Sequence, residues 1–337
     1  MTFSPIWITE EDVTSMVSLP DAIAALEGIL PLEAAGEAQN MPKGHLMVAK
    51  NDAMHVLGSS VDGEGICGFK NWINVQGKSE TIVELFSMEN GAHLAVIEAT
   101  ALGQMRTAAM TGIGTKRLAS KEANEMGIVG SGKQALPQVA ACHAVRPLKK
   151  LRVFSRNPEN RDAFAQAVRN EFDFKVTACN TLEETVINAP IVTIVTNATE
   201  PFLTADMLSR GTHLNAMGAI VPARIEFTDD VFERADIIAV DNLKTIKEMS
   251  SEFIKHYGEN KTSWSNIHSV SELIRKDIKR PSDADITLFK AMGMGLSDLS
   301  LAIDIYKRAR SEGRGTNLPQ RIKIPPRLQL IILIKSL

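Results

Sequence analysis

The sequence predicts an α/β protein in which a parallel-sheet domain, residues 118–295, is inserted into a split α+β domain built from residues 1–117 and 296–337. The first reason is a glycine-rich turn that directly follows a short apolar run. The second is a series of such runs separated by helical stretches, and the third is a hairpin-like pattern confined to the chain before residue 118. The chain is therefore expected to contain two sheets of different type.

Residues 1–117 are expected to begin with a helix and to continue as an antiparallel sheet. Ser18 can cap the first helical N–H groups, and Pro20 suits the first turn. Strand-like runs broken by Gly and Asn cover residues 68–75, 81–86 and 93–98. Their spacing is typical of hairpins. A helical pattern from Leu296 to Arg310 returns the chain, so both ends are predicted to build this domain.

Between residues 118 and 295 the pattern is typical of a parallel sheet with helices on both faces. The runs that predict its strands are residues 126–129, 151–154, 190–196, 211–217 and 236–241. The turn Gly130–Gly132 follows the first run, and a helix is expected after Gln134, with Ala135 in place of a third glycine. Glycine lets the backbone turn tightly and approach a pyrophosphate, which then lies on the helix N-terminus. The sequence therefore predicts a Rossmann-type dinucleotide-binding domain.

The composition is that of an ordinary globular protein, with 44% hydrophobic and 23% charged residues and a formal net charge of −3. This charge gives no indication of a nucleic-acid or anionic-membrane partner. Cys67, Cys142 and Cys179 are too few and too scattered for a disulfide framework or a metal site. The first residues lack the features of a signal peptide. We therefore expect a cytoplasmic protein without bound metal.

Two basic residues occupy positions where a charge is costly. Arg106 lies in a stretch of otherwise small, apolar residues, 99–109, and its guanidinium fork fits a carboxylate, although an ordinary structural ion pair is an equal alternative. Lys70 lies among apolar strand residues, where desolvation would lower its pKa and suit it to proton transfer. Most strand lysines are instead solvated. Lys43 is a weaker candidate.

The residues after the second predicted strand bear on the choice of nucleotide. In NAD-binding domains an acidic residue about 20 positions after the glycine motif binds the ribose 2′-hydroxyl. Here Ser155 holds that position and Arg156 follows it. A hydroxyl and a guanidinium would bind a 2′-phosphate that a carboxylate would repel. NADP(H) is therefore the expected cofactor, with NAD(H) possible, unless Arg156 is only a solvated surface residue.

Five motifs in this order resemble the ornithine cyclodeaminase/mu-crystallin family. They are Gly68–Lys70, Glu98 with Arg106–Ala109, Gly130–Ala135, His213–Gly218, and Lys290–Gly293 with Asp298. The resemblance covers roughly residues 5–318. It implies a nicotinamide-dependent enzyme, usually a homodimer formed through the split domain. Members include ornithine and lysine cyclodeaminases, alanine dehydrogenases, and reductases of ketimines and other imino acids.

The resemblance also implies roles for individual residues. Lys70 and Arg106 match the substrate-binding lysine and arginine and are expected to be catalytic. Lys43 stands where members usually have a second carboxylate-binding arginine, so it keeps the charge but loses the fork. Ile220 replaces an aspartate that assists ring closure in cyclodeaminases. The residues expected to bind the cofactor are Thr107, Gly130, Ser131, Gly132, Gln134, Ser155, Arg156, Asn157, Thr196, Met217, Gly218, Met292 and Gly293.

The expected activity is hydride transfer between NAD(P)H and a CH–NH or C=N group of a small imino or amino acid. Two alternatives stay open: an ammonia lyase of the ornithine cyclodeaminase type, and a catalytically inactive NADP-dependent ligand-binding protein like mu-crystallin. Loops around residues 43–58 and 71–80 are expected to form the pocket walls. The apolar run 328–334 is expected to be a terminal strand or a tail packed on the body or on a partner subunit.

Overall fold

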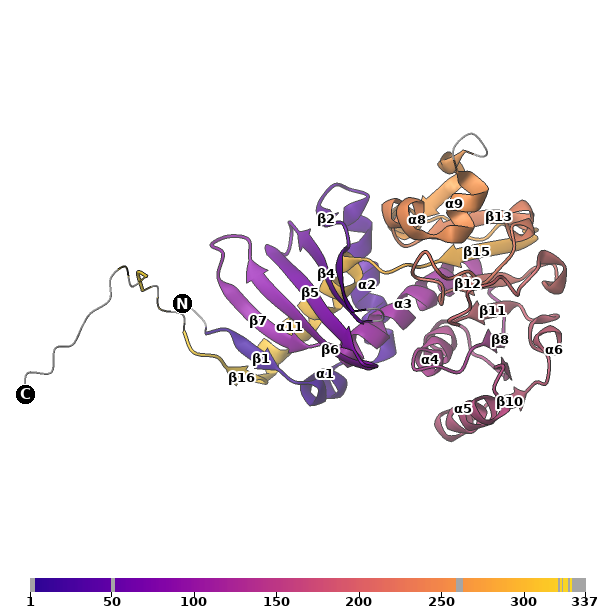
Figure 1. The fold of residues 1–337 in the computed structure, drawn as a ribbon, viewed down its shortest axis with the longest axis horizontal. Coiled ribbons are helices and arrows are strands. Elements are labelled where there is room, and N and C mark those ends of the chain that lie inside the picture. Colours follow the sequence, from indigo (N-terminus) through magenta and orange to yellow (C-terminus); the bar gives the residue numbers. More distant parts are fainter. Residues whose placement is uncertain are drawn as a thin grey trace, which may run out of the picture.

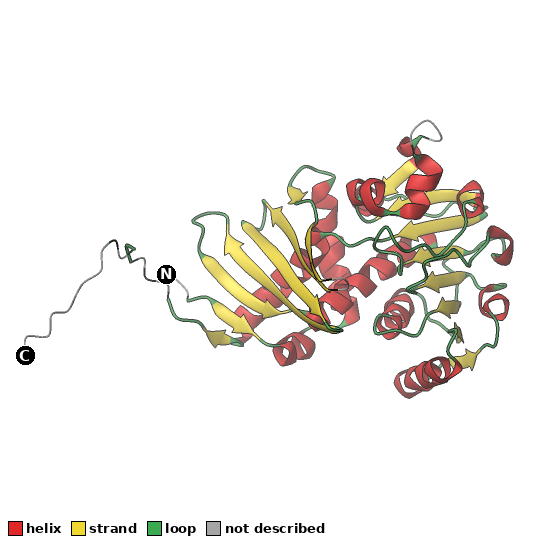
Figure 2. Ribbon diagram, viewed as in Figure 1, coloured by secondary structure: helices red, strands yellow, loops and turns green. Residues whose placement is uncertain are grey.

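Two sheets of eight strands each organise the part of the chain that the computed structural model describes (Figure 1, Figure 2). The described residues are 4–49, 52–258, 263–320, 322, 324–326 and 328. One sheet is mainly antiparallel, and every strand pair of the other is parallel. The predicted fold class is confirmed.

The first sheet has the order β16-β1-β7-β6-β5-β4-β2, and β3 also pairs with β4. Its strands are β1 (Ile6–Ile8), β2 (Ala38–Asn40), β3 (Gly44–Ala49), β4 (Asp52–Val61), β5 (Ile66–Val75), β6 (Lys78–Ser87), β7 (His93–Glu98) and β16 (Thr316–Asn317). Strands β3 to β7 form the predicted antiparallel hairpins. Ile6 pairs with Asn317, so segments near both ends of the chain join this sheet.

Four helices pack with this sheet, and α11 crosses one of its faces (Figure 1). They are α1 (Glu10–Met16), α2 (Leu19–Glu33), α3 (Thr100–Leu118) and α11 (Gly295–Glu312). The predicted cap of α2 is confirmed: Ser18 accepts from the Asp21 backbone N–H, and the Asp21 carboxylate accepts from Ser18. Apolar side chains of the helices and the sheet then form one continuous core, which includes Leu26, Ile97 and Met110.

The second sheet has the order β10-β9-β8-β11-β12-β15-β13-β14. Its strands are β8 (Glu125–Val129), β9 (Lys150–Phe154), β10 (Lys175–Ala178), β11 (Ile191–Ile194), β12 (His213–Ala216), β13 (Ala235–Val240), β14 (Ile267–Ser269) and β15 (Ile286–Lys290). The helices around it are α4 (Ala135–Val145), α5 (Pro158–Glu171), α6 (Leu182–Val186), α7 (Asp230–Arg234), α8 (Leu243–Met249), α9 (Ser251–Tyr257) and α10 (Val270–Arg275). The strand order reverses between β8 and β11, and ligands of such sheets bind beyond the carboxyl ends of the strands at that point.

The structure corrects two expectations. Five parallel strands were expected, but the sheet also includes β10, β14 and β15. β10 and β14 are short, and the apolar run of β15 ends in a lysine, Lys290, that is fully buried. Residues 43–58 and 71–80 lie mostly in strands β3 to β6 rather than in loops. The boundaries at 117/118 and 295/296 stay a prediction.

Of the apolar run 328–334 the structure describes only Leu328, which is exposed. Residues 329–334 lie outside the described residues. Within the described ranges no single helix is long and apolar enough to cross a membrane, and only the pair α1 and α2, bent by 87°, meets that test jointly. Among the same residues no group of three or more His, Cys, Asp or Glu could hold a metal ion. Cys67, Cys142 and Cys179 are free thiols.

Two glycine substitutions should have opposite effects on stability. Gly127 lies inside β8, where a Cβ would come within 2.4 Å of the Thr185 carbonyl oxygen. Gly28 lies within α2, where a Cβ would meet nothing within 4 Å. Gly127→Ala should lower the free energy of unfolding by about 1–3 kcal/mol, and Gly28→Ala should raise it by about 0.5–1 kcal/mol. Urea unfolding checks both values, and a neutral Gly127→Ala would contradict the close approach of β8 to α6.

Candidate functional site

A buried carboxylate brings together the two basic residues that the sequence singles out. Nζ of Lys70 and Nε of Arg106 each donate to Oδ1 of Asp298, both at 2.9 Å. The three side chains come from β5, α3 and α11. Lys70 is 8% exposed and Asp298 1%. Lys70 is therefore a buried, paired lysine, and the alternative of a solvated strand lysine is wrong.

The strand pattern places the ammonium of Lys70 on the helix-covered face of the sheet. Lys70 pairs across the strands with Leu57 and Val83, which are buried, and cross-strand partners lie on the same face. Gly103 of α3 leaves space for the lysine, because a Cβ there would be 3.2 Å from Nζ. A larger residue at position 103 would displace the ammonium from its carboxylate.

Burial and neighbouring cations lower the pKa of two lysines in this region. Burial lowers the pKa of Lys70, and Asp298 opposes this shift while Arg106 adds to it. Burial also lowers the pKa of Lys43, followed by repulsion from Arg106, while Asp241 opposes the shift. The structure thus brings all three predicted substrate-binding residues into one electrostatic cluster, where a carboxylate ligand would be attracted.

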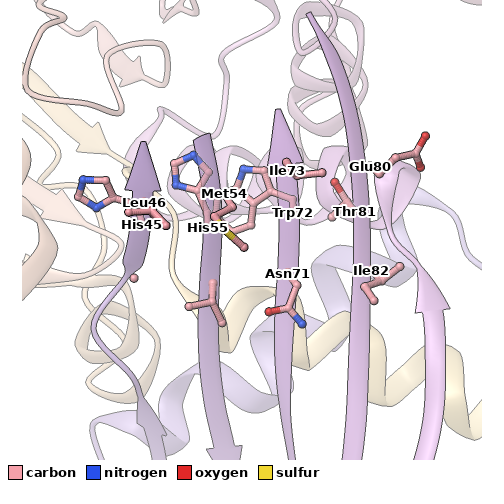
Figure 3. Close-up of a pocket in the computed structure, with 12 residues that line it drawn as sticks. His45, Leu46, Met54, His55, Asn71, Trp72, Ile73, Glu80, Thr81 and Ile82 are labelled. Atoms are coloured by element: carbon pink, nitrogen blue, oxygen red, sulfur yellow. The ribbon is translucent and has the colours of Figure 1, made fainter. Parts of the chain in front are cut away.

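Aromatic rings form one side of this cluster. The ring centre of Trp72 lies 5.2 Å from Nζ of Lys70 and 5.7 Å from Nζ of Lys43. His55 stacks on Trp72 with ring centres 4.6 Å apart, and His45 lies 6.2 Å from His55. Figure 3 shows the three rings across neighbouring strands. Cations over an aromatic face are stabilised, so Trp72 helps to hold both ammonium groups.

The opposite face of β3 to β6 carries a shallow apolar pocket of about 690 Å³ (Figure 3). Leu46 is 60% exposed, Met54 46% and Ile73 39%. These alternate with the residues that face the helices, because successive strand residues point to opposite faces. We call this surface the outer face.

A second cavity, of about 810 Å³, lies at the carboxyl ends of β8, β9 and β11. The predicted cofactor residues that line it are Gly130, Ser131, Gly132, Ser155, Arg156, Asn157 and Thr196. Gly130 has φ +113°, and a Cβ would lie 2.5 Å from the Val195 carbonyl oxygen. Only glycine fits there, and the turn leads directly to α4, whose N-terminal N–H groups suit an anion. The cavity therefore has the shape and chemistry that a dinucleotide requires.

The other predicted cofactor residues lie outside the lining of this cavity; they are Thr107, Gln134, Met217, Gly218, Met292 and Gly293. The side chains of Met217 and Met292 are buried in two hydrophobic cores. Gln134 is the N-cap residue of α4, and the Thr107 hydroxyl donates to the Gly103 carbonyl. Gly293 lies against Arg106, since its Cβ would be 3.6 Å from a guanidinium nitrogen.

Three buried carboxylates were not identified as site residues from the sequence. In the sequence Asp298 is marked only by the motif that begins at Lys290. Asp241 accepts from the backbone N–H groups of Asn242, Met292 and Gly293, at 2.6–2.9 Å, and burial raises its pKa to about 6. Its position directly after β13 was an available signal. Glu226 lies in a loop, where no pattern marked it.

Removing the charge of Asp298 should lower the pKa of Lys70 further. The carboxylate is the group that opposes desolvation, so in Asp298→Asn the lysine should lose its proton at lower pH than in the parent protein. A pH titration followed by NMR of ¹³Cε-labelled lysine, with the Lys70 signal assigned from Lys70→Met, measures the midpoint. Asp304→Asn, on the same helix and paired with Arg308, is the control and should leave the midpoint unchanged. An unchanged midpoint in Asp298→Asn would contradict the assigned coupling.

Known proteins share both the sequence pattern and the fold. The Bacillus cereus Delta(1)-pyrroline-2-carboxylate reductase is 30% identical over 239 residues, 70% of this chain and 73% of the relative. The Archaeoglobus fulgidus alanine dehydrogenase is 28% identical over 328 residues, 92% of this chain and 97% of the relative. The structure of Thermococcus litoralis Delta(1)-pyrroline-2-carboxylate reductase in complex with NADH and L-proline superposes with a TM-score of 0.87 at 25% identity, covering 93% of this chain and all of the other. The model of the ornithine cyclodeaminase/mu-crystallin family matches residues 5–313, and the chain belongs to this family.

Proposed function

We propose that this protein is an NAD(P)H-dependent oxidoreductase that transfers a hydride to or from the carbon of a C=N or CH–NH group in a small imino or amino acid. The observation that carries the proposal is the buried cluster of Lys70, Asp298 and Arg106. Gly293 connects this cluster to the parallel sheet, because it lies against Arg106 and its backbone N–H donates to Asp241. The relatives named for imine reduction and for alanine dehydrogenation support the same chemistry.

The residues of the cluster have distinct tasks in this proposal. Nε of Arg106 donates to Asp298. The guanidinium of Arg106 is planar and has two further nitrogens, which would bind the substrate carboxylate. Lys43 adds a second positive charge. Lys70, whose pKa burial lowers, is suited to exchange a proton with the substrate nitrogen. The nicotinamide nucleotide, when bound, supplies or accepts the hydride.

The alternatives are less well supported. Ile220 is 38% exposed, and its side chain can neither take up a proton nor bind an amino group, which weighs against cyclodeaminase chemistry. A protein that only binds a ligand has no need for a buried lysine paired with a carboxylate, which costs free energy to desolvate. The cytoplasmic location expected from the sequence remains a prediction.

Lys70→Ala should reduce turnover by a factor of about 10²–10⁴, since it removes a positioned proton donor, and should leave cofactor affinity nearly unchanged. NADPH oxidation with cyclic ketimines, with pyruvate plus amines and with iminosuccinate-type acids measures turnover, and fluorescence titration measures binding. Lys78→Ala, at an exposed position of β6, is the control. Near-normal turnover of Lys70→Ala would remove this lysine from the mechanism. Ammonia release from ornithine with catalytic NAD⁺ would instead favour the lyase.

We further propose a preference for NADP(H) over NAD(H). Ser155 and the exposed Arg156 line the nucleotide cavity, and the Ser155 hydroxyl lies 3.0 Å from that of Ser131 beside the glycine turn. Arg156→Ala should raise the KM for NADPH by about tenfold, because a charge-assisted contact with the 2′-phosphate is lost. The KM for NADH should stay the same, which makes NADH the internal control. Equal or better efficiency of the parent enzyme with NADH would contradict the preference.

The outer face supports a homodimer. A sheet covered by helices on one side normally presents polar residues to water on the other, whereas Leu46, Met54 and Ile73 are exposed here. A second copy of the same face would cover them. Ile73→Asp should therefore shift the protein to a monomer in sedimentation and light-scattering measurements. Ile187→Asp, at an isoleucine 51% exposed outside this face, should leave the assembly unchanged. A dimer that persists in Ile73→Asp would place the interface elsewhere.

A further inference from the structure

A single buried carboxylate connects the carboxyl ends of β11 and β12. Oε1 of Glu226 accepts from the backbone N–H of Thr196 at 2.7 Å and from its hydroxyl at 2.8 Å. Oε2 accepts from the backbone N–H groups of Gly218 at 2.8 Å and Ala219 at 2.9 Å. Each of the two Glu226 oxygens therefore accepts hydrogen bonds from the end of a different strand.

The cluster behind Glu226 is equally buried and polar. Glu226 has no exposed surface, and its backbone N–H donates to Oε1 of Glu252 at 3.2 Å. The same oxygen accepts from Nζ of the buried Lys290 at 3.4 Å, and Ser250 donates to the other oxygen at 2.8 Å. An ionised carboxylate is costly to bury unless hydrogen bonds satisfy it. Four donors on Glu226 meet that requirement, so the carboxylate holds its two loops firmly.

The loops it holds lie on one side of the glycine turn. Ser155 follows β9, the turn at Gly130 follows β8, Thr196 follows β11, and Gly218 follows β12. These strands are neighbours in that order. A dinucleotide with its adenosine ribose at Ser155 and its pyrophosphate at the turn must place its nicotinamide half toward β11 and β12. Thr196 itself lines the cavity.

The two loops also fit each other closely. A Cβ at Gly218 would lie 2.2 Å from the Thr196 nitrogen and 2.4 Å from Oε1 of Glu226. The backbone of the β12 loop therefore packs directly on the β11 loop, with the carboxylate beside both. Replacing the Glu226 carboxylate should therefore shift the backbone of both loops.

We infer that Glu226 is a positioning residue for the nicotinamide half of the cofactor. The inference rests on the proposed function. Glu226 acts through Thr196, Gly218 and Ala219, whose N–H groups it directs into the protein. The adenosine half depends instead on the glycine turn and on the residues after β9, which Glu226 does not contact.

Glu226→Gln tests the inference because it keeps the shape of the side chain. One oxygen becomes an NH₂ group, which then faces backbone donors at one of the two loops and cannot accept from them. Glu226→Asp is the second variant. It keeps the charge, but it is one methylene shorter and cannot reach both loops.

The readout is the affinity for two ligands, NADPH and 2′-phospho-ADP-ribose, measured by calorimetry. The second ligand has the adenosine, the 2′-phosphate and the pyrophosphate but no nicotinamide. Glu226→Gln should weaken NADPH binding by about tenfold or more, since at least one hydrogen bond is replaced by two opposed donors. Binding of 2′-phospho-ADP-ribose should change by less than about twofold on the same scale. Glu226→Asp should show the same split.

Glu252→Gln is the matched control, because Glu252 belongs to the same buried cluster and accepts from the Glu226 backbone N–H, whereas the bonds to Thr196, Gly218 and Ala219 are made by the Glu226 carboxylate. It should lower the thermal unfolding temperature but leave the ratio of the two affinities unchanged. Equal losses for both ligands in the Glu226 variants, or no loss for NADPH, would overturn the inference. If the parent protein binds neither ligand, the proposed function itself is wrong.

Discussion

The ion pairs of Asp298 are the interaction on which the candidate site depends. One carboxylate oxygen accepts from both Lys70 and Arg106, and the side chains of Lys70 and Asp298 are almost entirely shielded from water. Removing one partner of such a pair typically costs about 3–5 kcal/mol, because an uncompensated buried charge remains. The pairs hold a strand and two helices in a single relative position. The same carboxylate sets the charge balance of the site.

Helix α3 connects the cluster around Asp298 to the parallel sheet. It carries Arg106 and Gly103 near the cluster, and further along it donates and accepts hydrogen bonds inside the protein core. Nδ2 of Asn215 on β12 donates to the Thr115 hydroxyl at 3.1 Å, and Asn215 also bonds His213 at 3.0 Å. Burial lowers the pKa of His213 to about 3, so this histidine is neutral and structural. Helix α3, which carries Arg106, is thereby attached to β12 of the parallel sheet.

Buried carboxylates perform a common task in the parallel sheet. Glu226 connects the loops after β11 and β12, and Asp241 connects the ends of β13 and β15 through Met292 and Gly293. Each accepts backbone N–H groups that no strand partner uses, which satisfies donors at the strand ends. The catalytic proposal needs these loops in fixed positions, because hydride transfer depends on the distance and orientation of the two reacting carbons.

Features that depend on consecutive residues were predictable from the sequence alone. The capping box at Ser18, the glycine turn at Gly130 and the strand series around it follow from local spacing, since glycine conformation and side-chain alternation are properties of short segments. Lys70 and Arg106 were identifiable because a charge in an apolar segment is unusual. Their partner was not, because Asp298 is 228 and 192 residues away along the chain and only packing brings it to them. Lys290, Glu226 and the exposed outer face likewise depend on contacts between distant segments, so only the tertiary structure could decide them.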